Sequence, residues 1–178
     1  VHRGEKRRDA IHLLERNNRF PSFAGDLAAM IGAVEKATVS IRAILDKWGA
    51  DMVRAAVNHA IDQSERQMRA TVSAWRDGHY GATVHIDHDT MGTRDISVQV
   101  GCTVAGDQLT VDLSGTDDRQ DLVGVWNTFA NSRGYIMTQI AASIDPDIVK
   151  NEGLFNAVEI ILPEGCIAHP APNRPAAL

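Results

Sequence analysis

The sequence has few of the residues that mark several protein classes. It holds only two cysteines in 178 residues, Cys102 and Cys166, which lie far apart and outside any Cys-x-x-Cys pair. A disulfide framework and a structural zinc site are therefore not indicated, and a reducing cytoplasm is the expected location. No apolar run approaches the roughly 20 residues that cross a bilayer, so we expect no association with a membrane.

An excess of positive charge is also absent, because 18 Lys+Arg stand against 23 Asp+Glu and the formal net charge is -5. Nucleic acid is therefore not an expected partner. Neither Gly-x-x-x-x-Gly-Lys-Ser/Thr nor Gly-x-Gly-x-x-Gly occurs, so the chain carries no recognisable nucleotide site of its own. The 44% hydrophobic and 23% charged content is ordinary for a globular protein, and the length favours one compact domain or a piece of a larger one.

The N-terminal part, residues 1–77, is predicted to be helical. A short helix is expected over 2–19, ending before Pro21. From Asp26, the predicted N-cap, apolar residues recur at steps of three and four up to a C-cap at Gly49. A second helix follows, with its apolar face formed by Val53, Val57, Ile61, Met68, Val72 and Trp75. These two helices are predicted to form an antiparallel hairpin.

Residues 78–178 are predicted to form a mixed segment. Apolar and polar residues alternate over 95–113 around a turn at 105–107, which is typical of a β-hairpin. A long helix is predicted over 127–144 and a further strand over 158–162. The fold class is therefore α+β: a helical hairpin, a β-hairpin, a long helix and a strand. Because Val1 is not an initiator and the Pro-rich end stops at Leu178, we expect a fragment of a larger subunit, with both segments in one partial domain.

The densest group of candidate metal ligands comprises His79, His85, Asp87, His88 and Asp89. On a strand, His85, Asp87 and Asp89 share one face, and such ligands suit Zn, Mn or Fe. The alternative is an exposed edge strand with a polar outer face. We favour that alternative, since acidic and His residues are common on such faces, and predict no metal site in this chain.

A second candidate site begins at Asp112, which is expected to point away from Val111 and Leu113 at the end of a strand. The following Ser114-Gly115-Thr116 suits a loop of free backbone amides that holds an anion or a carbonyl oxygen. The same residues are equally typical of a turn. The residue pattern leaves both interpretations open.

Two amide-rich stretches bracket the last predicted helix, at 126–132 and 150–153. The Asn127 and Asn151 amides can orient a substrate carbonyl or amide, but Asn also caps helices and completes turns. Capping is the more common role for either residue alone. No Ser/His/Asp or Cys/His set is indicated, because Cys102 lies on the apolar side of a strand and Cys166 follows a turn.

Several short motifs occur in a fixed order along the chain. They are Asn-Arg-Phe-Pro at 18–21, Gly-Asp-Leu-Ala-Ala at 25–29, Trp-Gly at 48–49, Asp-Leu-Ser-Gly-Thr at 112–116, Lys-Asn-Glu-Gly-Leu-Phe at 150–155, Leu-Pro-Glu-Gly-Cys at 162–166 and Pro-Ala-Pro at 170–172. This order resembles the hydantoinase B/oxoprolinase family over residues 18–175. That family includes the B subunit of ATP-dependent N-methylhydantoinase, one half of 5-oxoprolinase, and the large subunits of acetone and acetophenone carboxylases.

The resemblance implies a hetero-oligomeric enzyme. A hydantoinase A-like ATPase partner, using ATP with Mg, would phosphorylate an amide, enol or carboxylate of a small-molecule substrate. This subunit would then complete hydrolysis or carboxylation while sheltering the intermediate from water. The family's metal-binding motifs lie upstream of Val1, so a divalent metal (Mn, Zn or Fe) is expected outside this chain.

The resemblance also carries over to particular positions. Asp112 and Ser114 match the family's Asp-x-Ser-Gly motif, and Asn151 with Gly153 matches its Asn-x-Gly motif. We predict Asp112 and Asn151 as catalytic residues, and Ser114 and Asn127 as substrate-binding residues.

The leading hypothesis is a catalytic B-type subunit of an ATP-dependent cyclic amide hydrolase. Asn-Ala at 156–157 stands where relatives tend to have Arg-Pro, which leaves a ketone carboxylase subunit open as the first alternative. The second alternative is an assembly segment without catalytic residues of its own.

Overall fold

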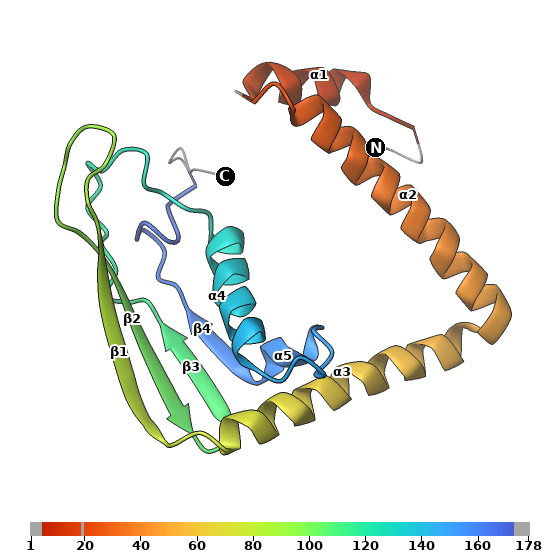
Figure 1. Cartoon of the computed structure of the whole chain (residues 1–178). Coiled ribbons are helices and arrows are strands. Elements are labelled where there is room, and N and C mark those ends of the chain that lie inside the picture. Colours follow the sequence, from red (N-terminus) through yellow and green to blue (C-terminus); the bar gives the residue numbers. More distant parts are fainter. Residues whose placement is uncertain (1–4, 19, 173–178) are drawn as a thin grey trace. The chain divides into compact units, whose positions relative to one another are not determined.

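The computed structural model describes residues 5–18 and 20–172, and the chain divides into two compact units, Val1–Ala56 and Val57–Leu178. The predicted division at residue 77 differs from this one, because the later part of the second long helix belongs with the sheet. Every described hydrophobic residue that is buried lies in the second unit. Figure 1 shows the elements of both units.

The first unit contains helix α1 (Arg8–Asn17) and helix α2 (Phe23–Trp48). Helix α2 begins after Ser22 rather than after Asp26, so the predicted N-cap at Asp26 is wrong; Asp26 lies in the first turn, where its carboxylate suits the positive end of the helix dipole. The predicted C-cap is confirmed. Gly49 has φ of 77°, and its N–H donates to the Leu45 carbonyl, which ends the helix.

Helix α3 (Ala50–Ser73) begins in the first unit and runs into the second. Its buried residues are Ser64, Met68 and Val72, whereas Val57 on the predicted apolar face is exposed. The buried side chains of α3 therefore all lie in about its last two and a half turns. The predicted antiparallel packing of α2 against α3 stays a prediction.

The sheet has four strands in the order β1-β2-β3-β4: β1 (Gly78–Ile86), β2 (Ile96–Ala105), β3 (Gln108–Asp112) and β4 (Val158–Ile161). Strands β1, β2 and β3 are antiparallel neighbours, while β4 pairs parallel to β3. The predicted hairpin is confirmed, and Gly106 in its turn has φ of 61°. Strand β1 is the exposed edge strand that the sequence suggested.

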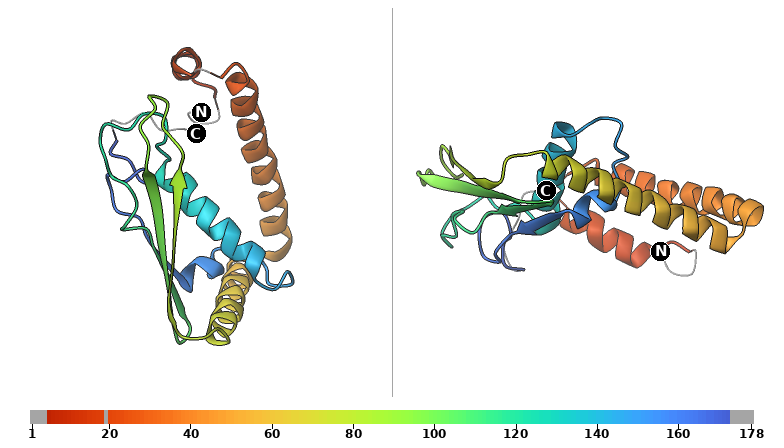
Figure 2. Two further views of the ribbon diagram at one scale, coloured as in Figure 1. Left: turned by 60° about the vertical axis from the view of Figure 1, so that its left-hand side comes forward. Right: turned by 90° about the horizontal axis from the view of Figure 1, so that it is seen from below.

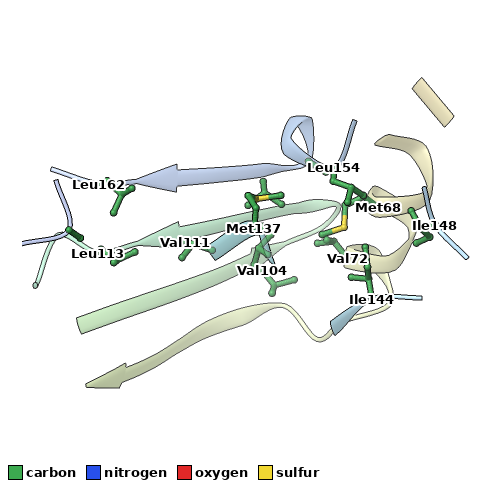
Figure 3. Packing of buried hydrophobic residues seen from close by; sticks show 14 of the residues in the cluster. Met68, Val72, Val104, Val111, Leu113, Met137, Ile144, Ile148, Leu154 and Leu162 are labelled. Carbon is green, nitrogen blue, oxygen red and sulfur yellow. The ribbon is translucent and has the colours of Figure 1, made fainter. Parts of the chain in front are cut away.

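A parallel pair needs a crossover connection, and helix α4 (Phe129–Ser143) with the short helix α5 (Gly153–Asn156) supplies it. Figure 2 shows α4 lying across one face of the sheet. The larger core cluster fills this layer and contains Met68 and Val72 of α3 together with Val104, Val111 and Met137 (Figure 3). The α+β class is confirmed.

The two faces of the sheet differ because strand side chains alternate. Val100, Cys102 and Val104 of β2 pack in or against the core. The intervening residues of β2, which are Gln99, Gly101 and Thr103, face the other side. The face opposite α4, called here the outer face, is therefore polar and carries the candidate site.

Candidate functional site

Two glycines lie side by side on the outer face. Gly81 of β1 pairs with Gly101 of β2, and Gly101 pairs in turn with Asp112 of β3. Because neither glycine has a side chain, the sheet is hollowed at this level into a cavity of about 360 Å³. We call it the outer-face hollow; its lining residues are His79, Gly81, Ala82, Thr83, Gln99, Val100, Gly101, Asp112, Ser114 and Gly115.

Asp112 supplies the negative charge of the outer-face hollow. Its Oδ1 accepts a hydrogen bond of 2.7 Å from the Ser114 backbone N–H. Hydrogen bonds from the Ser114 side chain and backbone lower the pKa of Asp112, and the nearby His79 acts in the same direction. The carboxylate is therefore ionised at neutral pH and has spare acceptor capacity.

His79 stands across Gly101 from the same carboxylate. A Cβ atom placed on Gly101 would lie 3.0 Å from His79 Cε1, so the imidazole occupies the space that the glycine leaves. His79 Nδ1 lies 3.1 Å from Thr103 Oγ1, which holds the ring in place. The sequence suggested His79 only as a metal ligand. The signal that could have indicated the hollow was the pair of glycines at 81 and 101, which leave space on a sheet because they lack side chains.

The loop after β3 is fastened to β2, which explains the Asp-Leu-Ser-Gly-Thr motif in structural terms. Thr116 Oγ1 donates to the Gln99 carbonyl at 3.0 Å, and the Thr116 N–H donates to the Leu113 carbonyl. A Cβ atom on Gly115 would lie 2.3 Å from Gln99 Oε1. Two of the three backbone amides at 114–116 are thus already bonded within the chain, which favours the turn interpretation over an anion-binding loop.

Asn127 lies at the start of α4, outside the outer-face hollow. Its Nδ2 donates to Ser132 Oγ at 3.1 Å, and its Oδ1 accepts from Asn131 Nδ2 at 2.8 Å. Its backbone N–H donates to the Ile167 carbonyl. Asn127 therefore joins the start of α4 to the segment after β4, which is a structural use of the amide.

Asn151 precedes α5 and holds it on α3. Its Nδ2 donates to the Ala60 carbonyl at 3.2 Å, and its Oδ1 accepts from the Gly153 N–H at 2.8 Å. A Cβ atom on Gly153 would come 2.1 Å from the Ile61 carbonyl oxygen, so only glycine fits against the helix there. The Asn-x-Gly motif thus fastens α5 to α3, and Asn151 does not line the outer-face hollow.

The group at 79–89 does not converge on a metal position. Asp89 is 2% exposed, and its carboxylate accepts from the backbone N–H groups of Met91, Thr93 and Val123 at 2.7–2.9 Å. Burial acts to raise the pKa of Asp89, but these hydrogen bonds outweigh it and the pKa is lowered. Among residues 5–18 and 20–172, no three His, Cys, Asp or Glu side chains are grouped so as to hold a metal.

Two further expectations concern membranes and cysteines. None of the helices within the described residues combines the length and the apolar character that a membrane span requires. Cys102 is half-buried, and burial raises the pKa of its thiol, while Cys166 is buried. A raised pKa disfavours the thiolate, so the structural interpretation of Cys102 holds.

The fold and the polar hollow define an α+β protein whose sheet carries a candidate small-molecule site on one face. The profile of the hydantoinase B/oxoprolinase family matches residues 1–178, and the chain belongs to that family. The family resemblance predicted from the ordered motifs is therefore confirmed.

Individual relatives are similar over nearly all of this chain. The beta subunit of the caprolactamase of Pseudomonas jessenii is 29% identical over 175 residues, and the B subunit of a putative D-/L-hydantoinase of Pseudomonas sp. (strain NS671) is 28% identical over 181 residues. These matches cover 96% and 94% of this chain but only 30% of each relative. The chain thus spans less than a third of the length of these relatives.

Two solved structures share the fold. The crystal structure of the ATP-dependent caprolactamase from Pseudomonas jessenii superposes with a TM-score of 0.81 at 28% identity, covering 98% of this chain and 30% of that one. The nucleotide-free structure of acetone carboxylase superposes with a TM-score of 0.76 at 17% identity, covering 95% of this chain and 24% of that one. The second similarity concerns the fold alone.

Proposed function

We propose that this chain acts within the B-type subunit of an ATP-dependent enzyme that opens cyclic amides. The observation that carries the proposal is the similarity to the Pseudomonas jessenii caprolactamase in both sequence and structure, at 29% identity and a TM-score of 0.81. Both sequence relatives are named as subunits, one beta and one B, which supports a multi-subunit enzyme. The proposed partner is a hydantoinase A-like ATPase, and the proposed location is the cytoplasm.

The proposed division of labour follows from the stability of the amide bond. Amide resonance makes a lactam a poor electrophile, so ATP-dependent phosphorylation supplies the driving force for opening the ring. ATP and Mg would bind to the ATPase partner, and a divalent metal would bind outside this chain. The residues described here would contribute binding, orientation and the exclusion of water.

Within this chain, the outer-face hollow is the proposed substrate-contacting region. The ionised Asp112 carboxylate is suited to accept a hydrogen bond from a ring N–H, and Ser114 holds that carboxylate in place. His79, held by Thr103, would face the same ligand from the other side of Gly101. Asn127 and Asn151 stay proposed site residues, although each amide is engaged in contacts that organise the fold.

The first experiment tests the reaction. The full-length B-type subunit and its A-type partner are purified together and supplied with ATP, Mg and one of three cyclic amides: caprolactam, hydantoin or 5-oxoproline. We expect ring opening of one of them that requires both subunits and ATP. Bicarbonate-dependent consumption of acetone or acetophenone without ring opening would instead establish the ketone carboxylase alternative.

The second experiment tests the outer-face hollow. Asp112→Asn keeps the shape of the side chain but removes its charge, and we expect kcat/KM to fall by about 10²-fold or more. Glu159→Gln is the matched control, because Glu159 lies on the neighbouring strand β4 and accepts a hydrogen bond from Thr110 outside the hollow. The control should retain full activity.

The assembly alternative predicts a different result. If this segment is only a scaffold, Asp112→Asn and Asn151→Ala leave turnover unchanged in every complex that assembles. Native mass spectrometry of each variant complex separates a loss of catalysis from a loss of assembly. Unchanged turnover of Asp112→Asn in an intact complex would refute the role proposed for the hollow.

A further inference from the structure

Helix α2 carries a row of apolar residues at alternating steps of four and three. Its large members are all exposed: Met30 is 66%, Val34 67%, Ile41 53%, Ile44 47% and Trp48 59% accessible. We call this row, completed by an alanine, the α2 seam; it consists of Met30, Val34, Ala37, Ile41, Ile44 and Trp48. It runs along roughly 27 Å of the helix.

Steps of four and three place side chains on one stripe of a helix, and such a stripe fits into the spaces between the side chains of a second helix. A partner strand would match a repeat of two residues instead. A helix on a lipid surface is typically rich in Lys and Arg on its polar face, whereas α2 has three acidic and three basic residues. A stripe of five large apolar side chains left in water is unfavourable, and exposed patches of this kind mark interaction surfaces. The α2 seam therefore fits an α-helical partner.

The residues that flank the seam distinguish a second copy from another part of the same polypeptide. On one side they are Ile31, Thr38 and Leu45, and on the other Ala33, Ser40 and Lys47, so Lys47 is the one charge. Helices that pair between separate chains commonly use charges at these positions to choose partner and register. Ile31 and Leu45 also widen the apolar stripe, so that its width is typical of a helix in a globular core.

We infer that the α2 seam packs against an α-helix from the part of the full-length B-type subunit that lies outside this chain. The inference rests on the proposed function, in that it takes the chain to act within such a subunit. The relatives leave room for this helix, since the chain covers 30% of the caprolactamase beta subunit. Covalent connection sets the register within one polypeptide, so charged flanks are not needed.

The test uses the full-length B-type subunit without its A-type partner. Val34→Gln and Ile41→Gln place a polar amide in the seam, and Val39→Gln is the matched control. The exposed fraction of Val39, 64%, is close to the 67% of Val34, but Val39 lies on the opposite side of the same helix. We expect each seam variant to lower the thermal unfolding midpoint by roughly 2–4 °C or more, with the oligomeric state unchanged and Val39→Gln near the wild type.

A photo-crosslinking amino acid at position 34 identifies the residue that covers the seam. We expect crosslinks to a helix of the same polypeptide that lies outside these 178 residues, and none from position 39. Crosslinks to α3 or α4 of this chain would contradict the inference. Crosslinks to a second copy, with dissociation of the seam variants into monomers, would overturn the inference. So would crosslinks only to the A-type partner in the complex, equal midpoints for all three variants, or a source polypeptide no longer than these 178 residues.

This experiment is independent of catalysis. Unfolding and crosslinking need no substrate, so a subunit that opens no cyclic amide can still support the helix contact. Conversely, an active enzyme whose seam variants unfold like the wild type would refute the contact and leave the proposed function intact.

Discussion

Two long helices with similar apolar patterns behave differently in this protein. Helix α3 buries Met68 and Val72 completely, while Met30 and Val34 of α2 are two-thirds exposed. The α3 residues are covered because the sheet, α4 and α5 supply the other side of the core. Apolar periodicity thus indicates which side of a helix can pack against other elements. Whether the side chains on that side are buried depends on the elements around the helix.

The largest effect that this comparison predicts is at the two methionines. Met68→Ala removes a fully buried side chain and should lower the free energy of unfolding by about 2–5 kcal/mol. Met30→Ala, measured like Met68→Ala in the 178-residue chain without the rest of the subunit, removes an exposed side chain and should change it by less than about 0.5 kcal/mol. Urea unfolding of both variants checks the contrast, and equal losses would show that α2 is already packed in this chain.

A second contrast uses two glycines. Gly153 of α5 has no room for a methyl group, because its Cβ would meet the Ile61 carbonyl oxygen and the Glu65 nitrogen of α3. Gly153→Ala should therefore destabilise by about 1–3 kcal/mol or more. Gly32 of α2 has open space, and Gly32→Ala should stabilise by about 0.5–1 kcal/mol through helix propensity. The thermal unfolding midpoint should therefore fall for Gly153→Ala and rise for Gly32→Ala. A higher midpoint for Gly153→Ala would contradict the close contact of α5 with α3.

The smallest effect concerns a carboxylate on α3. Glu65 accepts hydrogen bonds from Asn156 at 2.8 Å and from Arg69, and these lower its pKa in the folded state. Since the folded-state pKa lies below the unfolded one, the stabilisation is present above the unfolded pKa and is lost as pH falls through the folded pKa.

NMR titration should give Glu65 a pKa below the ordinary Glu value, and Asn156→Ala should raise it. Glu65→Gln should flatten part of the acid-side loss of thermal stability. A Glu65 pKa unaffected by Asn156→Ala would show that this hydrogen bond does not form in solution.

Local patterns predicted most of the elements. The alternation at 95–113 and the turn at 105–107 predicted the β2–β3 hairpin, and the stop at Gly49 predicted the end of α2. The start of α2 was predicted wrongly, because Asp26 has cap chemistry but the helix already begins three residues before it. An edge strand at β1 was suggested only as the alternative to the metal site and was left out of the predicted fold class, although Tyr80, Ala82, Val84 and Ile86 alternate there with more polar residues.

The candidate site was only partly predictable. Asp112 and Ser114 are two residues apart, so their hydrogen bond follows from local geometry. Asn151 was predicted as catalytic from its motif, and its bond to Ala60 of α3, 91 positions away, was not visible in the sequence. His79 was known only as one of several histidines until the register of β1 on β2 placed it beside Gly101 and Asp112.

The sequence by itself determined the types of most elements, the turn chemistry and the family, because these depend on neighbouring residues and on the order of short motifs. Tertiary structure alone decided that Gly81 pairs with Gly101, that His79 faces Asp112, and that Asn151 serves to hold α5. The physical reason is that strand register and the β3–α4–β4 crossover bring together groups far apart in the chain, and local patterns do not specify which long-range pairing buries the core best.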